Sequence, residues 1–102
     1  MKSITELITE AFATAISKGW HEKTPEFGTC VALMHSELSE ALEAYRTLNG
    51  KVLEDALSEE FADVCIRIFD TCGFMGLDLE SAIYRKMEKN KNRPYKHGGK
   101  KI

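Results

Sequence analysis

Four acidic residues stand at spacings that could hold a metal ion. Glu37 and Glu40 form an E-x-x-E pair, and Glu60 and Asp63 form an E-x-x-D pair after nineteen intervening residues. Carboxylates three apart lie on one side of a helix and repel one another unless a cation sits among them. Oxygen ligands without His or Cys suit a hard cation such as Mg²⁺ or Mn²⁺ rather than zinc. Because Mg²⁺ commonly binds through carboxylates together with substrate phosphates, the two pairs indicate a phosphorylated substrate.

A solvated helix face is the alternative interpretation of closely spaced acids. It fits Glu43, which projects away from the expected core of its helix. It fits the second pair less well, because the apolar residues of that helix spread over roughly 200° of its circumference. Such a helix is central in the fold or is covered by a second subunit. Its narrow polar stripe then points to a shared internal site; the stripe consists of Glu60, Asp63, Arg67 and Asp70.

Amphipathic periodicity predicts four helices and no strand. An S-x-x-E capping box at Ser3 starts the first helix, which ends before Gly19. The others are bounded by an Asn-Gly turn, by Gly76, by Asp78 as a cap and by Pro94. These three helices are expected over about 29–48, with Thr29 as the N-cap, about 53–75 and about 79–92. Short connections between them predict one all-α domain over residues 1–102, shaped like a four-helix bundle.

Composition and cysteine content favour a cytoplasmic protein without a membrane partner. No stretch approaches the roughly 20 apolar residues of a membrane span, and the first residues do not form a signal peptide. Cys65 and Cys72 are seven apart on an apolar helix face, which predicts buried free thiols. A chain of 102 residues buries only about 60–65% of its unfolded surface. Self-association would add to that burial.

Charge is distributed unevenly along the chain. Residues 85–102 contain eight Lys/Arg and one Glu, a net charge of +7, so the other 84 residues carry −9. The composition predicts a basic, flexible tail over residues 93–102. An acidic body argues against nucleic acid as a partner, since nonspecific binding depends on neutralising many phosphates.

The fourth helix and the first loop add polar and aromatic groups. Lys86 and Asn90 project in the same sector as the apolar residues of their helix, which predicts a polar centre facing the acids. Trp20 and His21 lie in a glycine-bounded loop that could stack on a nucleobase. The alternatives are that Trp20 packs against the first helix and that His21 is simply exposed.

Several segments resemble the MazG-like nucleotide pyrophosphohydrolases, in particular the short single-domain branch of the all-α NTP pyrophosphatase superfamily. They are KGW (18–20), HSELSEALEAYR (35–46), EEFADVCIRIFD (59–70) and GLDLESAIYRKMEKNKNRPYKHGGK (76–100). The family signature is E-x-x-E, a spacer and E-x-x-D, and the ending K-x-x-x-N-x-x-R-P-Y-x-H-G-G-K strengthens the likeness. Many relatives have a further Glu before the first signature acid, where this chain has Ser36.

The resemblance implies a Mg²⁺-dependent enzyme, with Mn²⁺ as a possible substitute, that hydrolyses (d)NTP to (d)NMP and pyrophosphate. It implies a nucleotide-pool role and a homodimer or homotetramer. The metal ligands, one of them acting on the attacking water, would be Glu37, Glu40, Glu60 and Asp63. The substrate-binding residues would be Lys86, Asn90, Arg93, Tyr95 and Lys96.

Two further functions stay open at the level of sequence. The same fold and site could act on another phosphorylated substrate, as the related phosphoribosyl-ATP pyrophosphatases do. A noncatalytic helical binding module with a basic tail is the other alternative, and there the acid pairs would have no role.

Overall fold

The computed structural model describes residues 1–95, and these residues form four α-helices and no strand. The helices are α1 (Ile4–Ser17), α2 (Phe27–Thr47), α3 (Gly50–Met75) and α4 (Leu79–Lys91). The predicted all-α class is confirmed. None of these helices is long and apolar enough to cross a membrane.

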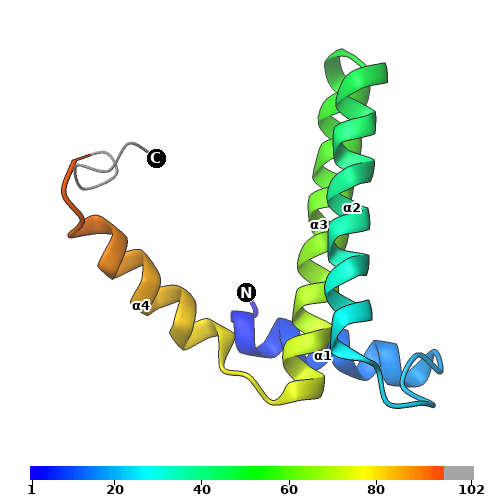
Figure 1. Ribbon diagram of the computed structural model, residues 1–102, viewed down its shortest axis with the longest axis vertical. Coiled ribbons are helices and arrows are strands. Elements are labelled where there is room, and N and C mark those ends of the chain that lie inside the picture. Colours follow the sequence, from blue (N-terminus) through cyan, green and yellow to red (C-terminus); the bar gives the residue numbers. More distant parts are fainter. Residues whose placement is uncertain (96–102) are drawn as a thin grey trace.

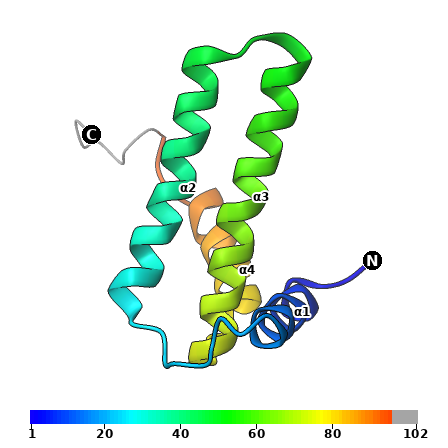
Figure 2. The same ribbon diagram turned by 90° about the vertical axis from the view of Figure 1, so that its right-hand side faces the viewer.

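The centre of the structure is an antiparallel hairpin of α2 and α3 (Figure 1). Helix α1 crosses the end of this hairpin that lies away from its turn and packs against α3. Helix α4 packs on α1 and leads away from the hairpin in Figure 1, so that it lies behind the hairpin in the turned view (Figure 2). Since α4 does not lie along the hairpin, the expected four-helix bundle is not closed within one chain.

Helix starts follow capping chemistry. The capping box of α1 is present, because the Ser3 side chain accepts a hydrogen bond from the Glu6 amide and the Glu6 carboxylate accepts one from the Ser3 amide. Asp78 caps α4 as predicted. Helix α2 differs: its N-cap is Glu26, whose carboxylate accepts a hydrogen bond from the Thr29 amide at 2.8 Å. Thr29, the predicted cap, is therefore the third residue of the helix.

The turn between α2 and α3 is shorter than predicted. Gly50 adopts a left-handed backbone conformation, with φ of +63°, and already counts as the first residue of α3. Only Leu48 and Asn49 separate the two helices. Helix α3 thus begins three residues earlier than predicted and ends as expected before Gly76.

Close packing between α1 and α3 depends on Gly73. A Cβ atom at this position would lie 2.6 Å from Cβ of Phe12, well inside the contact distance of two carbons. The missing side chain lets the ring of Phe12 rest against the backbone of α3. Buried apolar residues are few among residues 1–95: Ile8, Ala15, Ala41 and Cys72.

The accessible surface is large for a chain of this size, and many large apolar side chains are exposed on it. The accessible surface is 8166 Å², whereas a compact monomer of 11.5 kDa is expected to expose about 5800 Å². The radius of gyration is 16.5 Å, against about 13 Å for a compact domain of this length.

All three cysteines are free, but only Cys72 is buried; Cys65 is exposed, so the prediction of a buried thiol is wrong there.

Candidate functional site

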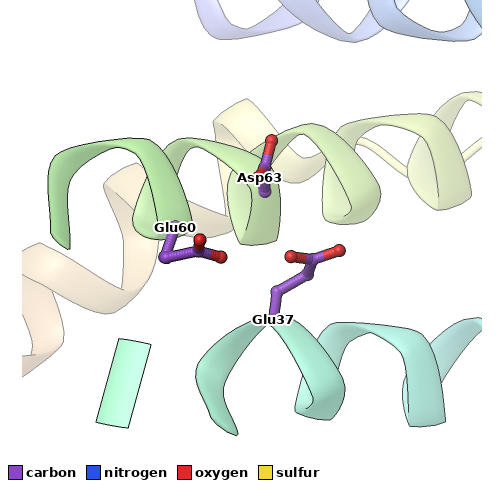
Figure 3. A group of neighbouring side chains, drawn as sticks. All are labelled: Glu37, Glu60 and Asp63. Carbon is purple, nitrogen blue, oxygen red and sulfur yellow. The ribbon is translucent and has the colours of Figure 1, made fainter. Parts of the chain in front are cut away.

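The two acid pairs meet across the seam between α2 and α3. One carboxylate oxygen from each of Glu37, Glu60 and Asp63 lies within 4.8 Å of the others. Figure 3 shows Glu37 reaching from α2 toward α3, where Glu60 and Asp63 stand one turn apart. This grouping, called the acidic cluster below, follows from the helical repeat, because residues three apart share a face.

Glu40 adjoins the acidic cluster without belonging to it. Partial burial is the main reason that the pKa of Glu60 is raised. The neighbouring carboxyl groups of Glu40, Asp63 and Glu37 raise this pKa further. Oε2 of Glu60 is also buried and receives no hydrogen bond among the described residues. All four predicted acids are therefore neighbours, and the three other carboxyl groups contribute to the raised pKa of Glu60.

Glu37 is the most buried of the four, at 8% exposure. Its charge is balanced by Arg67, whose Nε donates a hydrogen bond to Oε1 of Glu37 at 2.9 Å. Arg67 lies one turn after Asp63 on the polar stripe of α3. The ion pair therefore ties α2 to α3 at the cluster.

A polar contact between side chains ties the first loop to α3. Nε2 of His21 lies 2.7 Å from Oδ1 of Asp70. The imidazole ring has its edge against Phe12 and stacks near Phe74, with centroid distances of 5.1 and 5.6 Å. Its side chain is only 11% exposed, so the interpretation of His21 as an exposed loop residue is wrong.

A cavity of about 750 Å³ lies between α1, the first loop and the hairpin, and its wall includes Glu37 and Asp63. The cavity therefore adjoins the acidic cluster. Much of its wall is apolar or aromatic, and Trp20 and His21 both belong to it. Trp20 is 63% exposed and does not pack as a core residue. A space of this size and lining is typical of small-molecule sites.

The residues predicted on the fourth helix lie elsewhere in this single chain. Lys86 and Asn90 are exposed, so their expected inward placement is not found. Arg93 and Tyr95 are exposed as well, and no residue of α4 lines the cavity. Lys96 lies outside the described residues, as does most of the tail predicted over 93–102.

Three features of the site were not predicted. The sequence places Arg67 and Asp70 on the polar stripe of α3, but it gives no indication of their partners Glu37 and His21. The contribution of α1 to the cavity wall was also missed. The third is that Ser36 donates its hydroxyl hydrogen to the Leu33 carbonyl oxygen at 2.7 Å.

Comparisons with known proteins add nothing to these observations. No protein-family model, no curated protein and no solved structure with which the chain was compared matches it.

Proposed function

We propose that the chain is a divalent-cation-dependent nucleotide pyrophosphohydrolase that converts (d)NTP and water to (d)NMP and pyrophosphate. The observation that carries the proposal is the acidic cluster beside a cavity of about 750 Å³. The sequence resemblance to MazG-like enzymes supplies the reaction. Housekeeping of the nucleotide pool would be the corresponding role.

The donor set fits a hard cation. Three carboxylates converge from two helices, none of the cluster residues is His or Cys, and one carboxylate oxygen is buried without a donor. Mg²⁺ prefers such oxygen ligands and keeps water or phosphate in its remaining positions, and Mn²⁺ accepts the same set. We therefore assign Glu37, Glu60 and Asp63 as ligands, with Glu40 as a neighbour that could join them. When bound, a cation of this kind supplies charge neutralisation at the phosphates and makes a coordinated water more acidic.

The reaction requires a group that takes up a proton. Water attacks the α-phosphorus, an O–P bond forms, and the bond between the α-phosphorus and the bridging oxygen breaks, so that pyrophosphate leaves with the electron pair. Glu40 is our candidate for the proton acceptor, because it lies next to the cluster but outside the three converging carboxylates. A positioned carboxylate of this kind typically contributes about 10²–10⁴-fold to a rate.

The cavity is the proposed place for the nucleoside. Trp20 offers an exposed aromatic face at its wall, and bases stack on such faces irrespective of their identity. The resemblance also assigns phosphate contacts to Lys86, Asn90 and Arg93, and substrate contacts to Tyr95 and Lys96. Those assignments remain predictions.

A homo-oligomer would account for the exposed apolar surface. The total accessible surface, polar and apolar together, exceeds that of a compact monomer by about 2400 Å², which is comparable to what each chain of an obligate dimer buries. Part of it is a stripe on α2 at i, i+4 and i+7, made by Leu38, Leu42 and Tyr45. An apolar stripe of this kind is the usual surface through which helices associate. We propose that a second copy of the chain covers it, in a dimer or a tetramer.

A product assay tests the proposed reaction. The purified protein is incubated with each NTP and dNTP and Mg²⁺, with EDTA as a control, and the products are separated by ion exchange. We expect monophosphate and pyrophosphate, and no turnover in EDTA. Diphosphate and phosphate would refute attack at the α-phosphorus, and a lack of turnover of every nucleotide would favour another phosphorylated substrate or a binding module.

Amide variants connect the reaction to the site. Glu40→Gln and Asp63→Asn should each reduce kcat by at least about 10²-fold while the far-ultraviolet circular dichroism stays helical. Glu43→Gln is the matched control, because Glu43 lies on the same helix as Glu40 but pairs with Arg46 and is not a neighbour of Glu60. Activity that survives both changes would show that the acids are not the site.

A further inference from the structure

We propose that Arg67 contacts the phosphates of the substrate while its Nε remains fixed on Glu37. This inference deepens the proposed function and rests on it, because it assigns a further substrate-binding residue to the same site. It does not depend on α4, to which the sequence assigned the phosphate contacts.

The first support is the charge of the cavity wall. Arg67 is the only Arg or Lys in the cavity wall, as far as residues 1–95 show. The same wall contains five carboxylates: Glu10, Glu26, Glu37, Asp63 and Asp70. An anionic ligand that enters this cavity beside the acidic cluster therefore meets one permanent positive charge besides any bound cation.

The second support is the way in which Arg67 is held. Its Nε–H is committed to Oε1 of Glu37 at 2.9 Å, and no other hydrogen bond of its guanidinium occurs within the described part of the chain. The side chain is 36% exposed, so the group is anchored but still accessible. The two terminal nitrogens carry four further N–H donors in a planar fork, and this geometry matches two oxygens of a phosphate.

The third support is the position of Glu37. A single oxygen of Glu37 joins the group with Glu60 and Asp63, and the same carboxylate also holds Arg67. Glu37 is almost fully buried, so both partners are fixed relative to one another. The Glu37 carboxylate thereby fixes the distance between the cation position and the guanidinium. A phosphate that contacts both groups needs them at such a fixed distance.

Binding of two probes in separate experiments tests the inference without catalysis. Mn²⁺ alone is titrated and followed by electron paramagnetic resonance, and inorganic pyrophosphate is titrated calorimetrically in the presence of Mn²⁺. The variants are Arg67→Gln and Arg67→Lys. Arg46→Gln is the matched control, because Arg46 also pairs with a glutamate, Glu43, but at 3.4 Å on an exposed surface.

The two probes should respond differently: only the pyrophosphate affinity should fall. Arg67→Gln removes a positive charge beside the carboxylates, so its Mn²⁺ affinity should equal or exceed that of the unchanged protein. Its pyrophosphate affinity should fall by roughly 10- to 100-fold, which is the usual effect of losing a charged hydrogen bond. Arg67→Lys keeps the positive charge without the planar fork of donors, so its pyrophosphate affinity should lie between those of the unchanged protein and Arg67→Gln. Arg46→Gln should bind both probes as the unchanged protein does.

Two results would overturn the inference. Parallel loss of Mn²⁺ and pyrophosphate affinity in Arg67→Gln would mean that Arg67 only supports Glu37. Unchanged pyrophosphate affinity in both Arg67 variants, or no pyrophosphate binding by the unchanged protein, would remove the phosphate contact. Should Arg67→Gln fail to fold, Arg67→Lys decides by the same comparison.

The outcome also separates this inference from the proposed reaction. If pyrophosphate binding depends on Arg67 but no nucleotide is hydrolysed, the reaction is wrong and the phosphate contact stands. If nucleotides are hydrolysed and Arg67→Gln leaves KM unchanged, the reaction stands and the inference is wrong.

Discussion

His21 and Asp70 are 49 positions apart in the chain, yet Nε2 of the first lies 2.7 Å from Oδ1 of the second. The pair joins the first loop to α3, and the imidazole ring lies beside the rings of Phe12 and Phe74. Both residues line the cavity. The contact therefore holds one wall of the candidate nucleoside site against another.

Replacing His21 by alanine should loosen that wall. The change removes two ring contacts and leaves the Asp70 carboxylate, which is 22% exposed, without its partner. We expect the free energy of unfolding to fall by about 1–3 kcal/mol, measured by urea denaturation. Trp20→Ala is the neighbouring control: Trp20 is mainly exposed, so its loss should change stability by less than about 0.5 kcal/mol. A larger loss of stability in Trp20→Ala than in His21→Ala would contradict this structure of the loop.

Trp20 can be tested separately as a base-stacking residue. If the base of the substrate stacks on its indole ring, Trp20→Ala should raise KM by about tenfold or more and change kcat less, because stacking is worth about 1–3 kcal/mol per base. Steady-state kinetics on the preferred nucleotide provide the measurement. An unchanged KM would remove Trp20 from the binding site and leave the rest of the cavity in place.

Glu60 should destabilise the protein when no cation is present. Its pKa is raised above the ordinary value of 4.5 by burial and by the neighbouring carboxylates. The folded protein thus takes up this proton more readily than the unfolded chain, and the resulting stability is fully present below pH 4.5 and lost as the pH rises through the raised pKa. Glu60→Gln should therefore have the higher Tm in EDTA at pH 7, with a difference that shrinks toward pH 4.5.

Added Mn²⁺ should reverse this order. The unchanged protein gains stability in proportion to its cation affinity, whereas Glu60→Gln has lost a ligand and gains less. Differential scanning calorimetry with and without Mn²⁺ measures both effects, and Glu43→Gln should behave as the unchanged protein in each. A lower Tm of Glu60→Gln in EDTA would contradict the repulsion described for the acidic cluster.

Gly73 should tolerate no side chain. An added Cβ would lie 2.6 Å from Cβ of Phe12, so Gly73→Ala must push α1 away from α3. The expected cost is about 1–3 kcal/mol, despite the higher helix propensity of alanine. Gly28→Ala, also within a helix, is the milder comparison: its new methyl group meets only the end of the Glu26 side chain, 3.0 Å from the oxygen that caps α2, so a smaller loss of stability is expected. Equal stability of the two variants by urea denaturation would refute the close α1–α3 contact.

The apolar stripe of α2 should govern self-association. Leu42 and Tyr45 are 62% and 67% exposed in the single chain, and lysines there would be buried without partners in an oligomer. We expect Leu42→Lys/Tyr45→Lys to shift the protein to monomer in sedimentation equilibrium. Ser39→Lys/Glu43→Lys, on a different face of the same helix, should leave the oligomer intact. A monomeric unchanged protein would refute the proposed association.

Sequence periodicity accounts well for features that reside within one helix. Glu37 with Glu40, and Glu60 with Asp63, are placed together by the 3.6-residue repeat alone, and facing helices then bring the two pairs into contact. The caps at Ser3 and Asp78 are equally local. Residue type alone does not identify the N-cap of α2, because two nearby side chains are both able to cap the helix. The conformation of the loop selects Glu26 over Thr29 there.

Features that depend on how helices are arranged could not be derived in this way. The periodicity of α4 groups Lys86 with the apolar residues of its helix, but it does not say which element covers that face, and in the single chain α4 leaves the hairpin and Lys86 is exposed. The partners of Arg67 and Asp70 lie on other elements, 30 and 49 positions away. No pattern within α3 contains that information.

The two-residue connection between α2 and α3 has a consequence for the order in which the molecule folds. A short connection makes the contacts of the hairpin local, and local contacts form before distant ones because they close smaller loops. The acidic cluster lies wholly on this hairpin, whereas the cavity also requires α1 to dock on α3 across more than 50 positions of chain. We therefore expect the carboxylates to assemble during the early phase of folding. A cation present at that stage could then bind before the cavity exists.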